Sequence, residues 1–222
     1  SAIIVAAGSG KRMNLDINKQ FIKLQGKEII AITISKFYNN PDISEIIVCI
    51  KEEEKDIFDS IFKKYNFKNI KIAFGGKERQ DTINNGLNLL DKNSEIVLIH
   101  DGARPFVSEK IIKDTILSCM ENKAVIVAVP VKDTIKIVQN GEIQITPNRA
   151  NIWAAQTPQV FQKEIITNAY KKAYNDNFYG TDDSSLVERI GYKVKIVSGN
   201  YDNIKITSPE DLSIAESILN RI

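Results

Sequence analysis

Short apolar runs alternate with longer amphipathic segments along most of the chain, and this alternation limits the fold more than any other feature. Continuously apolar runs this short are typical of strands buried on both faces. Such strands occur in parallel sheets that helices cover on both sides. The sequence therefore predicts an α/β fold with a mostly parallel sheet, and the expected strands are Ala2–Ala6, Glu45–Ile50, Ile70–Phe74, Ile96–His100 and Ala124–Val129.

The segments between these strands carry apolar residues at helical spacing. The clearest covers residues 52–65, and its apolar face is expected to contain Ile57, Phe58, Ile61, Phe62 and Tyr65. The last expected helix has a readable start, since Ser208 is a good N-cap and Pro209 suits the first helical position. Further helices are expected over Glu28–Asn39, Glu78–Leu90, Ser108–Glu121, Gln162–Tyr174 and Pro209–Asn220.

One segment departs from this pattern. Residues 131–149 alternate apolar and polar side chains around Asn140-Gly141, which is a strong signal for a hairpin turn. In an α/β domain such an excursion is often an arm that packs on another subunit, and a plain surface hairpin is the alternative. No repeat, low-complexity tract or linker interrupts the chain, so we expect one domain, residues 1–222, with an arm at 131–150.

Composition excludes several classes of protein. The 222 residues are 43% hydrophobic, which is ample for a buried core, and 30 cations against 28 anions argue against nucleic-acid binding. One histidine and two distant cysteines make a Cys/His zinc site improbable. No apolar run is long enough to span a bilayer, and the N-terminal cations follow the apolar run, unlike those of a signal peptide. We expect a soluble cytoplasmic protein with reduced thiols.

The loop "AAGSGKRM", residues 6–13, follows the first strand and has the composition of an anion-binding loop. It lacks the spacing of a Walker A motif, and the third glycine of the dinucleotide fingerprint is replaced by Met13. What remains is a loop whose backbone N–H groups are freed at Gly8 and Gly10, with Arg12 and Lys19 able to close on a polyphosphate. A flexible glycine loop with solvated cations is the alternative.

Polar residues at other strand ends suggest what surrounds this loop. In "GGKERQDTINNGL", glycines permit close backbone approach, and Arg79 stands at the start of a helix where Asp81 could be an ordinary cap. Asp101 ends an apolar strand, where open α/β sheets bind ligands, and beside phosphates such a carboxylate usually binds Mg²⁺. His100 is expected to be structural. Lys205 lies in a strand-like run, "IKI", that could aim its ammonium into the same crevice.

Arginine usage is uneven. Four of the six arginines, Arg12, Arg79, Arg104 and Arg149, lie in glycine-, proline- or turn-rich segments. A guanidinium binds phosphate or carboxylate in a bidentate manner that lysine cannot match. These positions therefore favour binding of an anionic ligand.

Taken together, the motifs resemble 2-C-methyl-D-erythritol 4-phosphate cytidylyltransferases over essentially the whole chain. The segments that carry the resemblance are "IIVAAGSGKRM…NKQF", "GGKERQDT", "HDGARPF", "VKDTIK", "WAAQTPQVF", "TDDSSLVE" and "DNIKIT". The resemblance implies a Rossmann-like nucleotidyltransferase fold and a homodimer joined through protruding β-arms. It also implies transfer of CMP from CTP to methylerythritol phosphate, with Mg²⁺ and with release of pyrophosphate.

The resemblance also implies roles for individual residues. Arg12, Lys19 and Lys205 would be catalytic, and Asp101 or, second, Asp202 would lie near Mg²⁺. The nucleotide would be bound by Ala6, Ala7, Gly8, Gly10, Gly75, Gly76, Arg79, Thr82, Asp101 and Gly102. The acceptor phosphate would be bound by Asp101, Thr134, Arg149, Thr157, Thr181 and Lys205, with Thr134 and Arg149 expected to come from the partner subunit.

Two other functions remain open at this point. A cytidylyltransferase for ribitol 5-phosphate or a related polyol phosphate shares several of these elements. A nucleotide-binding module without catalysis is the second alternative, and the presence of both Arg12 and Lys19 argues against it.

Overall fold

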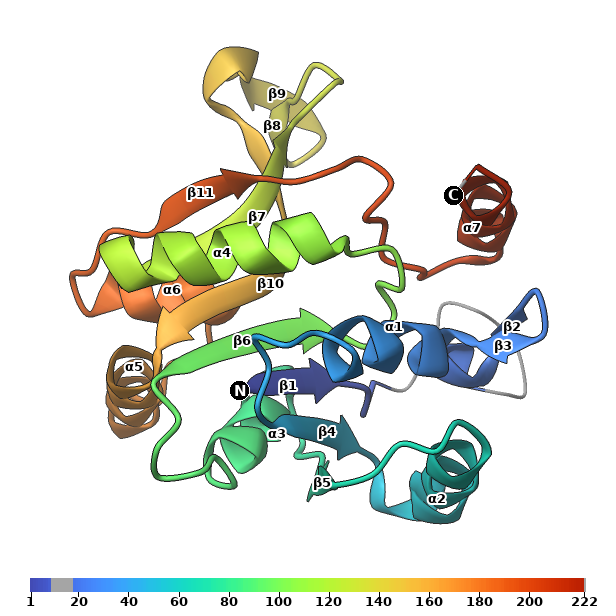
Figure 1. Ribbon diagram of the computed structural model, residues 1–222. Helices are drawn as coiled ribbons and strands as arrows, with labels where there is room; N and C mark the ends of the chain where they lie inside the picture. The colour runs from blue at the N-terminus through green and yellow to red at the C-terminus, as the bar shows by residue number, and fades with distance from the viewer. Residues whose placement is uncertain (9–17, 222) are drawn as a thin grey trace.

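A seven-stranded sheet runs through the protein (Figure 1). The structure, a computed structural model, describes residues 1–8 and 18–221. All neighbouring strands are parallel except β10, which is antiparallel to both of its neighbours, so the mostly parallel sheet is confirmed. The strand order is β11 (Lys195–Ser198), β7 (Ala124–Pro130), β10 (Trp153–Gln162), β6 (Ile96–Asp101), β1 (Ala2–Val5), β4 (Ile46–Ile50) and β5 (Ile70–Phe74).

Helices cover both faces of the sheet because its strands are apolar on both faces. In β1, Ile4 packs into the cluster on one face and Ile3 into the cluster on the other. The first face is covered by α1 (Ile29–Tyr38), α2 (Lys55–Lys64) and α4 (Glu109–Asn122), and the second by α3 (Arg79–Leu87), α5 (Lys163–Asn175) and α6 (Asp183–Arg189).

A third, smaller core lies under the last helix, α7 (Pro209–Leu219), beside the short hairpin of β2 (Lys23–Leu24) and β3 (Lys27–Glu28). Leu24 and Ile218 are buried in it. The expected helix start is confirmed, since Asp211 accepts a hydrogen bond from the Ser208 backbone N–H at 2.9 Å in a capping box. Within the described ranges, no helix combines the length and apolar character that a membrane span requires.

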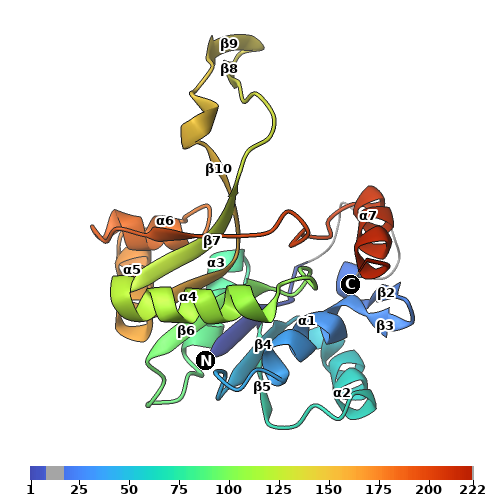
Figure 2. The same cartoon turned by 45° about the horizontal axis from the view of Figure 1, so that its top comes forward.

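The predicted hairpin is present and projects from the body of the protein (Figure 2). Its strands are β8 (Ile137–Gln139) and β9 (Glu142–Ile145). Asn140 and Gly141 have φ values of 52° and 82°, the positive values that a type I′ turn requires. Every residue of the two strands is exposed, so in this chain the arm is held by its own turn and by the strands that lead into it.

Several elements were not expected from the sequence: the hairpin of β2 and β3, β10, α6 and β11. Pro158 and the glutamines of "WAAQTPQVF" argued against a central strand. The pairing of β10 with β7 is interrupted between Ala155 and Gln159, and Pro158 lies at this interruption. A short edge strand such as β11, whose residues are mostly exposed, carries little apolar signal.

Two local predictions were wrong. Residues 204–206 do not form a strand, and one backbone bond from Ile206 N to Ala103 O, at 2.9 Å, holds them beside β6. On α2, Phe58 and Ile61 are buried as expected, whereas Ile57 is 47% exposed. Five apolar residues make a wider stripe than the part of the helix that faces the sheet.

The packing predicts different costs for two apolar truncations. Phe161→Ala removes a fully buried ring between β10 and α5 and is expected to lower the free energy of unfolding by about 3–5 kcal/mol. Met120→Ala, on the exposed side of α4, is expected to change it by less than about 0.5 kcal/mol. Urea denaturation of both variants measures the difference, and equal losses would contradict the described core.

Candidate active site

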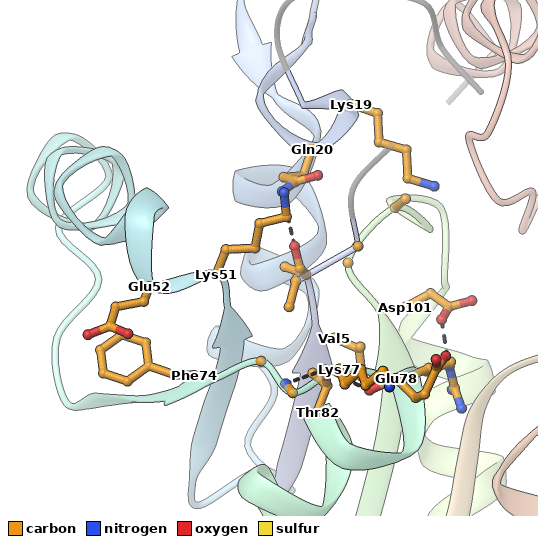
Figure 3. Close-up of a pocket in the computed structure, with 18 of the residues that line it drawn as sticks. Val5, Lys19, Gln20, Lys51, Glu52, Phe74, Lys77, Glu78, Thr82 and Asp101 are labelled. Atoms are coloured by element: carbon orange, nitrogen blue, oxygen red, sulfur yellow. Dashed lines mark hydrogen bonds and ion pairs between the residues drawn. The ribbon is translucent and has the colours of Figure 1, made fainter. Parts of the chain in front are cut away.

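A cavity of about 640 Å³ opens at the carboxyl ends of the parallel strands (Figure 3). This is the edge at which open α/β sheets bind their ligands. Eleven of the predicted site residues line it: Ala6, Ala7, Gly8, Lys19, Gly75, Gly76, Arg79, Thr82, Asp101, Gly102 and Lys205. Gly10 and Arg12 lie outside the described residues. The cavity therefore brings the described members of the predicted nucleotide-binding set together from three separate segments, with Lys19 and Lys205 beside them.

Glycine is required where β5 ends, because the backbone there packs against neighbouring segments. A Cβ on Gly75 would lie 2.5 Å from the Cβ of Ala7, and one on Gly76 would lie 2.3 Å from the Cβ of Asp81. The Gly76 N–H donates to Thr82 Oγ1 at 3.0 Å. Bare backbone is thereby held at the cavity wall, where a ligand can approach it closely.

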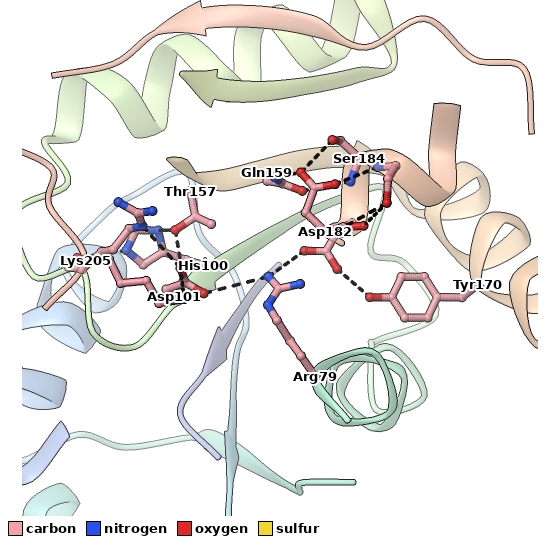
Figure 4. Close-up of polar contacts among 12 residues, drawn as sticks. Arg79, His100, Asp101, Thr157, Gln159, Tyr170, Asp182, Ser184 and Lys205 are labelled. Carbon is pink, nitrogen blue, oxygen red and sulfur yellow. Dashed lines mark hydrogen bonds and ion pairs between the residues drawn. The ribbon is translucent and has the colours of Figure 1, made fainter. Parts of the chain in front are cut away.

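Asp101 lies at the end of β6 and is surrounded by cations (Figure 4). Its Oδ2 is 3.0 Å from Lys205 Nζ and 3.3 Å from Arg104 Nε, and its Oδ1 is 3.9 Å from Arg79 Nη2. Burial alone would raise the pKa of Asp101, but Lys205, Arg79 and Arg104 together hold it well below its ordinary value. The carboxylate is thus ionised, and the three cations of this cluster exceed its two carboxylates, Asp101 and Asp183, by one.

The backbone of Asp101 is fixed from behind by two buried side chains. Thr157 Oγ1 accepts a hydrogen bond from the Asp101 N–H at 3.1 Å and lies 3.0 Å from His100 Nδ1. His100 Nε2 lies 3.0 Å from the carbonyl oxygen of Arg104, so Nε2 carries the proton and Nδ1 accepts from the threonine hydroxyl. Thr157 therefore lies behind Asp101 and does not line the cavity, while His100 has the structural place that we expected.

Arg79 is anchored from a second direction (Figure 4). Its Nη2 donates to Asp183 Oδ2 at 2.8 Å, and Tyr170 Oη donates to Asp183 Oδ1 at 2.6 Å. Asp183 and Tyr170 are each 1% exposed. The guanidinium consequently lies between a buried carboxylate on α6 and Asp101 on β6. Sequence reasoning missed Tyr170 and Asp183, because a tyrosine at helical spacing and an acid after an N-cap have ordinary structural explanations.

Four predicted residues lie away from this cavity. Thr134 and Arg149 are exposed on or beside the arm, and the Arg149 Nη1 donates to the carbonyl oxygen of Lys132 at 2.7 Å. Thr181 is exposed beside Asp182, which caps the start of α6. Asp202 forms an exposed ion pair with Arg221 at 2.9 Å. Further lining residues that the sequence did not indicate include Gln20, Lys51, Phe74, Lys77 and Glu78.

The side chains around the cavity suit a metal ion that is held mainly by the phosphates of a bound nucleotide. Across the residues that the structure describes, no group of three or more His, Cys, Asp or Glu side chains could hold a metal ion. Mg²⁺ is often bound by one or two carboxylates together with phosphate oxygens and water. Asp101 fits the part of a single protein ligand, because its Oδ1 lies 3.9 Å from Arg79 Nη2, beyond hydrogen-bond distance, while Lys205 and Arg104 contact the other oxygen.

The buried imidazole of His100 gives a testable titration. Burial lowers its pKa to about 4 from 6.5, so the unfolded chain binds the proton more tightly and stability decreases as pH falls from about 6.5 towards about 4. His100 is the one histidine in the chain, so its NMR signal needs no assignment by mutation. We expect a midpoint near 4 in the folded protein and near 6.5 in concentrated urea. A folded midpoint above 6 would contradict the described environment.

Known proteins resemble this chain over its whole length. The family model described as IspD, 2-C-methyl-D-erythritol 4-phosphate cytidylyltransferase, matches residues 1–221. A relative of that name from Clostridioides difficile is 66% identical over 99% of this chain and 93% of its own. Another, from Caldanaerobacter subterraneus, is 48% identical over 100% of this chain and 99% of its own.

Solved structures agree with the sequence relatives. A 4-diphosphocytidyl-2C-methyl-D-erythritol synthase from Anaerococcus prevotii superposes with a TM-score of 0.89 at 42% identity, covering 99% of this chain and 95% of its own. The cytidylyltransferase from Thermus thermophilus superposes with a TM-score of 0.80 at 26% identity, covering 100% and 98%. With this fold, this cavity and these relatives, the chain belongs to the 2-C-methyl-D-erythritol 4-phosphate cytidylyltransferase family.

Proposed function

We propose that this chain transfers CMP from CTP to 2-C-methyl-D-erythritol 4-phosphate, giving 4-diphosphocytidyl-2-C-methyl-D-erythritol and pyrophosphate. The observation that carries this function is the cavity where Lys19, Lys205 and Asp101 meet the backbone of Ala6–Gly8 and Gly75–Gly76, in a chain of the cytidylyltransferase family. The reaction belongs to the biosynthesis of isoprenoid precursors.

The chemistry requires charge neutralisation more than proton transfer. The nucleophile is a phosphate oxygen of the acceptor, which is already anionic at neutral pH, so no general base is needed. It attacks the α-phosphorus of CTP while the bond to the β-phosphate oxygen breaks and pyrophosphate leaves. Two polyanions must be held in line, which calls for fixed cations and positioning. The excess of cations around Asp101 supports this mechanism.

We assign the following roles to individual residues. Lys19 and Arg12 would bind the triphosphate and stabilise the departing pyrophosphate, and Lys205 would contact the α-phosphate and the acceptor phosphate. Asp101 would hold Lys205 in place through the 3.0 Å ion pair and would be the protein ligand of Mg²⁺, which would neutralise phosphate charge. Gly75, Gly76, Arg79 and Thr82 would shape the pocket for the cytidine, with Gly102 beside them.

A coupled pyrophosphate assay tests the function. The purified chain is incubated with each of four nucleoside triphosphates and with either methylerythritol phosphate or ribitol 5-phosphate. We expect pyrophosphate release with CTP and methylerythritol phosphate. Faster turnover of ribitol 5-phosphate would favour the alternative polyol-phosphate enzyme, and nucleotide binding without pyrophosphate release would favour a non-catalytic module.

Replacement of Lys19 tests the role of that lysine. Lys19→Ala is expected to lower kcat by about a hundredfold or more, with a smaller change in KM for CTP, because the leaving group gains charge in the transition state. Steady-state kinetics measure both constants. Lys68→Ala, which removes an exposed lysine, is the control for loss of one positive charge and should retain full activity. Unchanged kcat for Lys19→Ala would refute the role.

The arm, residues 131–150, would join two copies of a single nucleotidyltransferase domain. Apolar side chains on the arm support this proposal, since Ile137, Val138, Ile143 and Ile145 are each more than half exposed. Exposed apolar surface of this kind marks interaction sites. Arg149 and Thr134 would then reach the acceptor site of the partner. Two buried thiols, Cys49 and Cys119, support a reducing, cytoplasmic location.

Mixed dimers test whether the site is shared. Arg149→Ala and Lys19→Ala chains are each inactive in this proposal. If Arg149 acts in the partner's site, a mixed dimer has one intact site, and equal mixing recovers about a quarter of wild-type activity. The two chains are mixed in denaturant and refolded together, and the activity is then measured per subunit. Absence of recovered activity would show that each chain supplies both residues to its own site.

A further inference from the structure

Lys19 is carried by a single 3₁₀ turn, η2 (Lys19–Phe21), and both residues that flank it are tied to one carboxylate. Asn18 Nδ2 donates to Glu54 Oε1, and Gln20 Nε2 donates to Glu54 Oε2 at 3.1 Å. Gln20 Nε2 also donates to the carbonyl oxygen of Ala6 at 3.0 Å. Glu54 thereby holds both neighbours of Lys19, and Gln20 also connects the turn to Ala6, the residue after β1.

The Glu54 side chain is buried, where it accepts from the two amides and also interacts with Lys51. Glu54 ends η3 (Glu52–Glu54) and occupies the N-cap position of α2, yet its side chain makes no capping hydrogen bond. Glu54 is 4% exposed and Gln20 is 2% exposed, whereas Glu52 and Glu53 are exposed. Burial raises the pKa of the Glu54 carboxyl, so the protein bears a cost to keep it there.

The same segment holds η2 from a second side. The ring of Phe21 packs edge-on against Phe58 of α2, with centroids 5.3 Å apart. The turn that carries Lys19 is therefore fixed by an apolar contact at one end and by two amide–carboxylate bonds around the lysine. Since a lysine side chain is long and flexible, the position of its backbone decides how well the ammonium is placed.

We infer that Glu54 is a positioning residue, which holds the Lys19 turn through Asn18 and Gln20 so that the ammonium is aimed at the phosphates of the nucleotide. The inference rests on the proposed role of Lys19. A carboxylate suits this position because it accepts hydrogen bonds without donating any, and both partners are amide donors. An amide at position 54 would turn one of the two contacts into donor against donor.

The first test replaces one oxygen of the carboxylate. Glu54→Gln is expected to lower kcat by about tenfold or more, with a smaller change in KM for CTP, because misplacement of a catalytic group acts on the transition state. Asp56→Asn removes an exposed carboxylate from the first turn of the same helix and controls for the loss of charge. Unchanged kcat in Glu54→Gln would overturn the inference.

Reversing the hydrogen bond separates positioning from folding. In Asn18→Asp/Glu54→Gln, the new amide can donate to the new carboxylate and its oxygen can still accept from Gln20, so kcat should recover towards the wild-type value. In a Lys19→Ala background, Glu54→Gln should cause less than about a twofold further loss, because both changes act through the same lysine. An equal fold-loss in both backgrounds would make Glu54 a structural residue alone.

Binding of inorganic pyrophosphate, measured by calorimetry, tests without turnover whether Glu54 positions Lys19. Glu54→Gln should weaken it by a factor approaching that of Lys19→Ala, and Asp56→Asn should not weaken it. A wild-type chain that binds pyrophosphate but releases none from CTP would overturn the proposed function and leave this inference standing. Equal pyrophosphate affinity in wild type and Glu54→Gln would overturn the inference.

Discussion

The site depends on the buried carboxylate of Asp101 and on the three cations that face it. A carboxylate this deep in the protein is stable as an anion only when it is paired, and Lys205, Arg104 and Arg79 supply that pairing. They come from three different segments, so the ion cluster joins the last loop, the end of β6 and the start of α3. Asp101, together with Asp183 at Arg79, holds in one cluster cations that would otherwise repel each other, and one positive charge remains in excess for a polyphosphate to meet.

Support for this cluster comes from side chains that carry no chemistry themselves. Asp183 and Tyr170 hold Arg79, while Thr157 and His100 hold the backbone of Asp101. Each of these buried polar groups has a partner, which is the condition under which a polar network makes a site rigid. The positions of the cations are therefore set before any nucleotide binds, as electrostatic stabilisation of a transition state requires.

Much of this could be read from the sequence, and the remainder has physical reasons. Apolar runs predicted β1, β4, β5, β6 and β7 because buried parallel strands have a strong signal, whereas β10 was hidden by Pro158. Glycines and cations at strand ends predicted the residues around the cavity. Tyr170, Asp183 and Glu54 were not predicted, because their importance lies in contacts between distant segments. Lys205 lies in the crevice as predicted, although the residues around it do not form the predicted strand.

The antiparallel strand β10 has a consequence for how this protein tolerates change. It begins at Trp153, where the arm ends, and passes Thr157, which supports Asp101, before it reaches the core at Phe161. Its pairing with β7 stops after Ala155 and resumes at Gln159, so Thr157 lies at an interruption between two paired segments. A change of length in the exposed outer arm leaves both paired segments in place. A change of length within the interruption would displace the hydroxyl that supports Asp101, so the stem of the arm is tied to the geometry of the site below it.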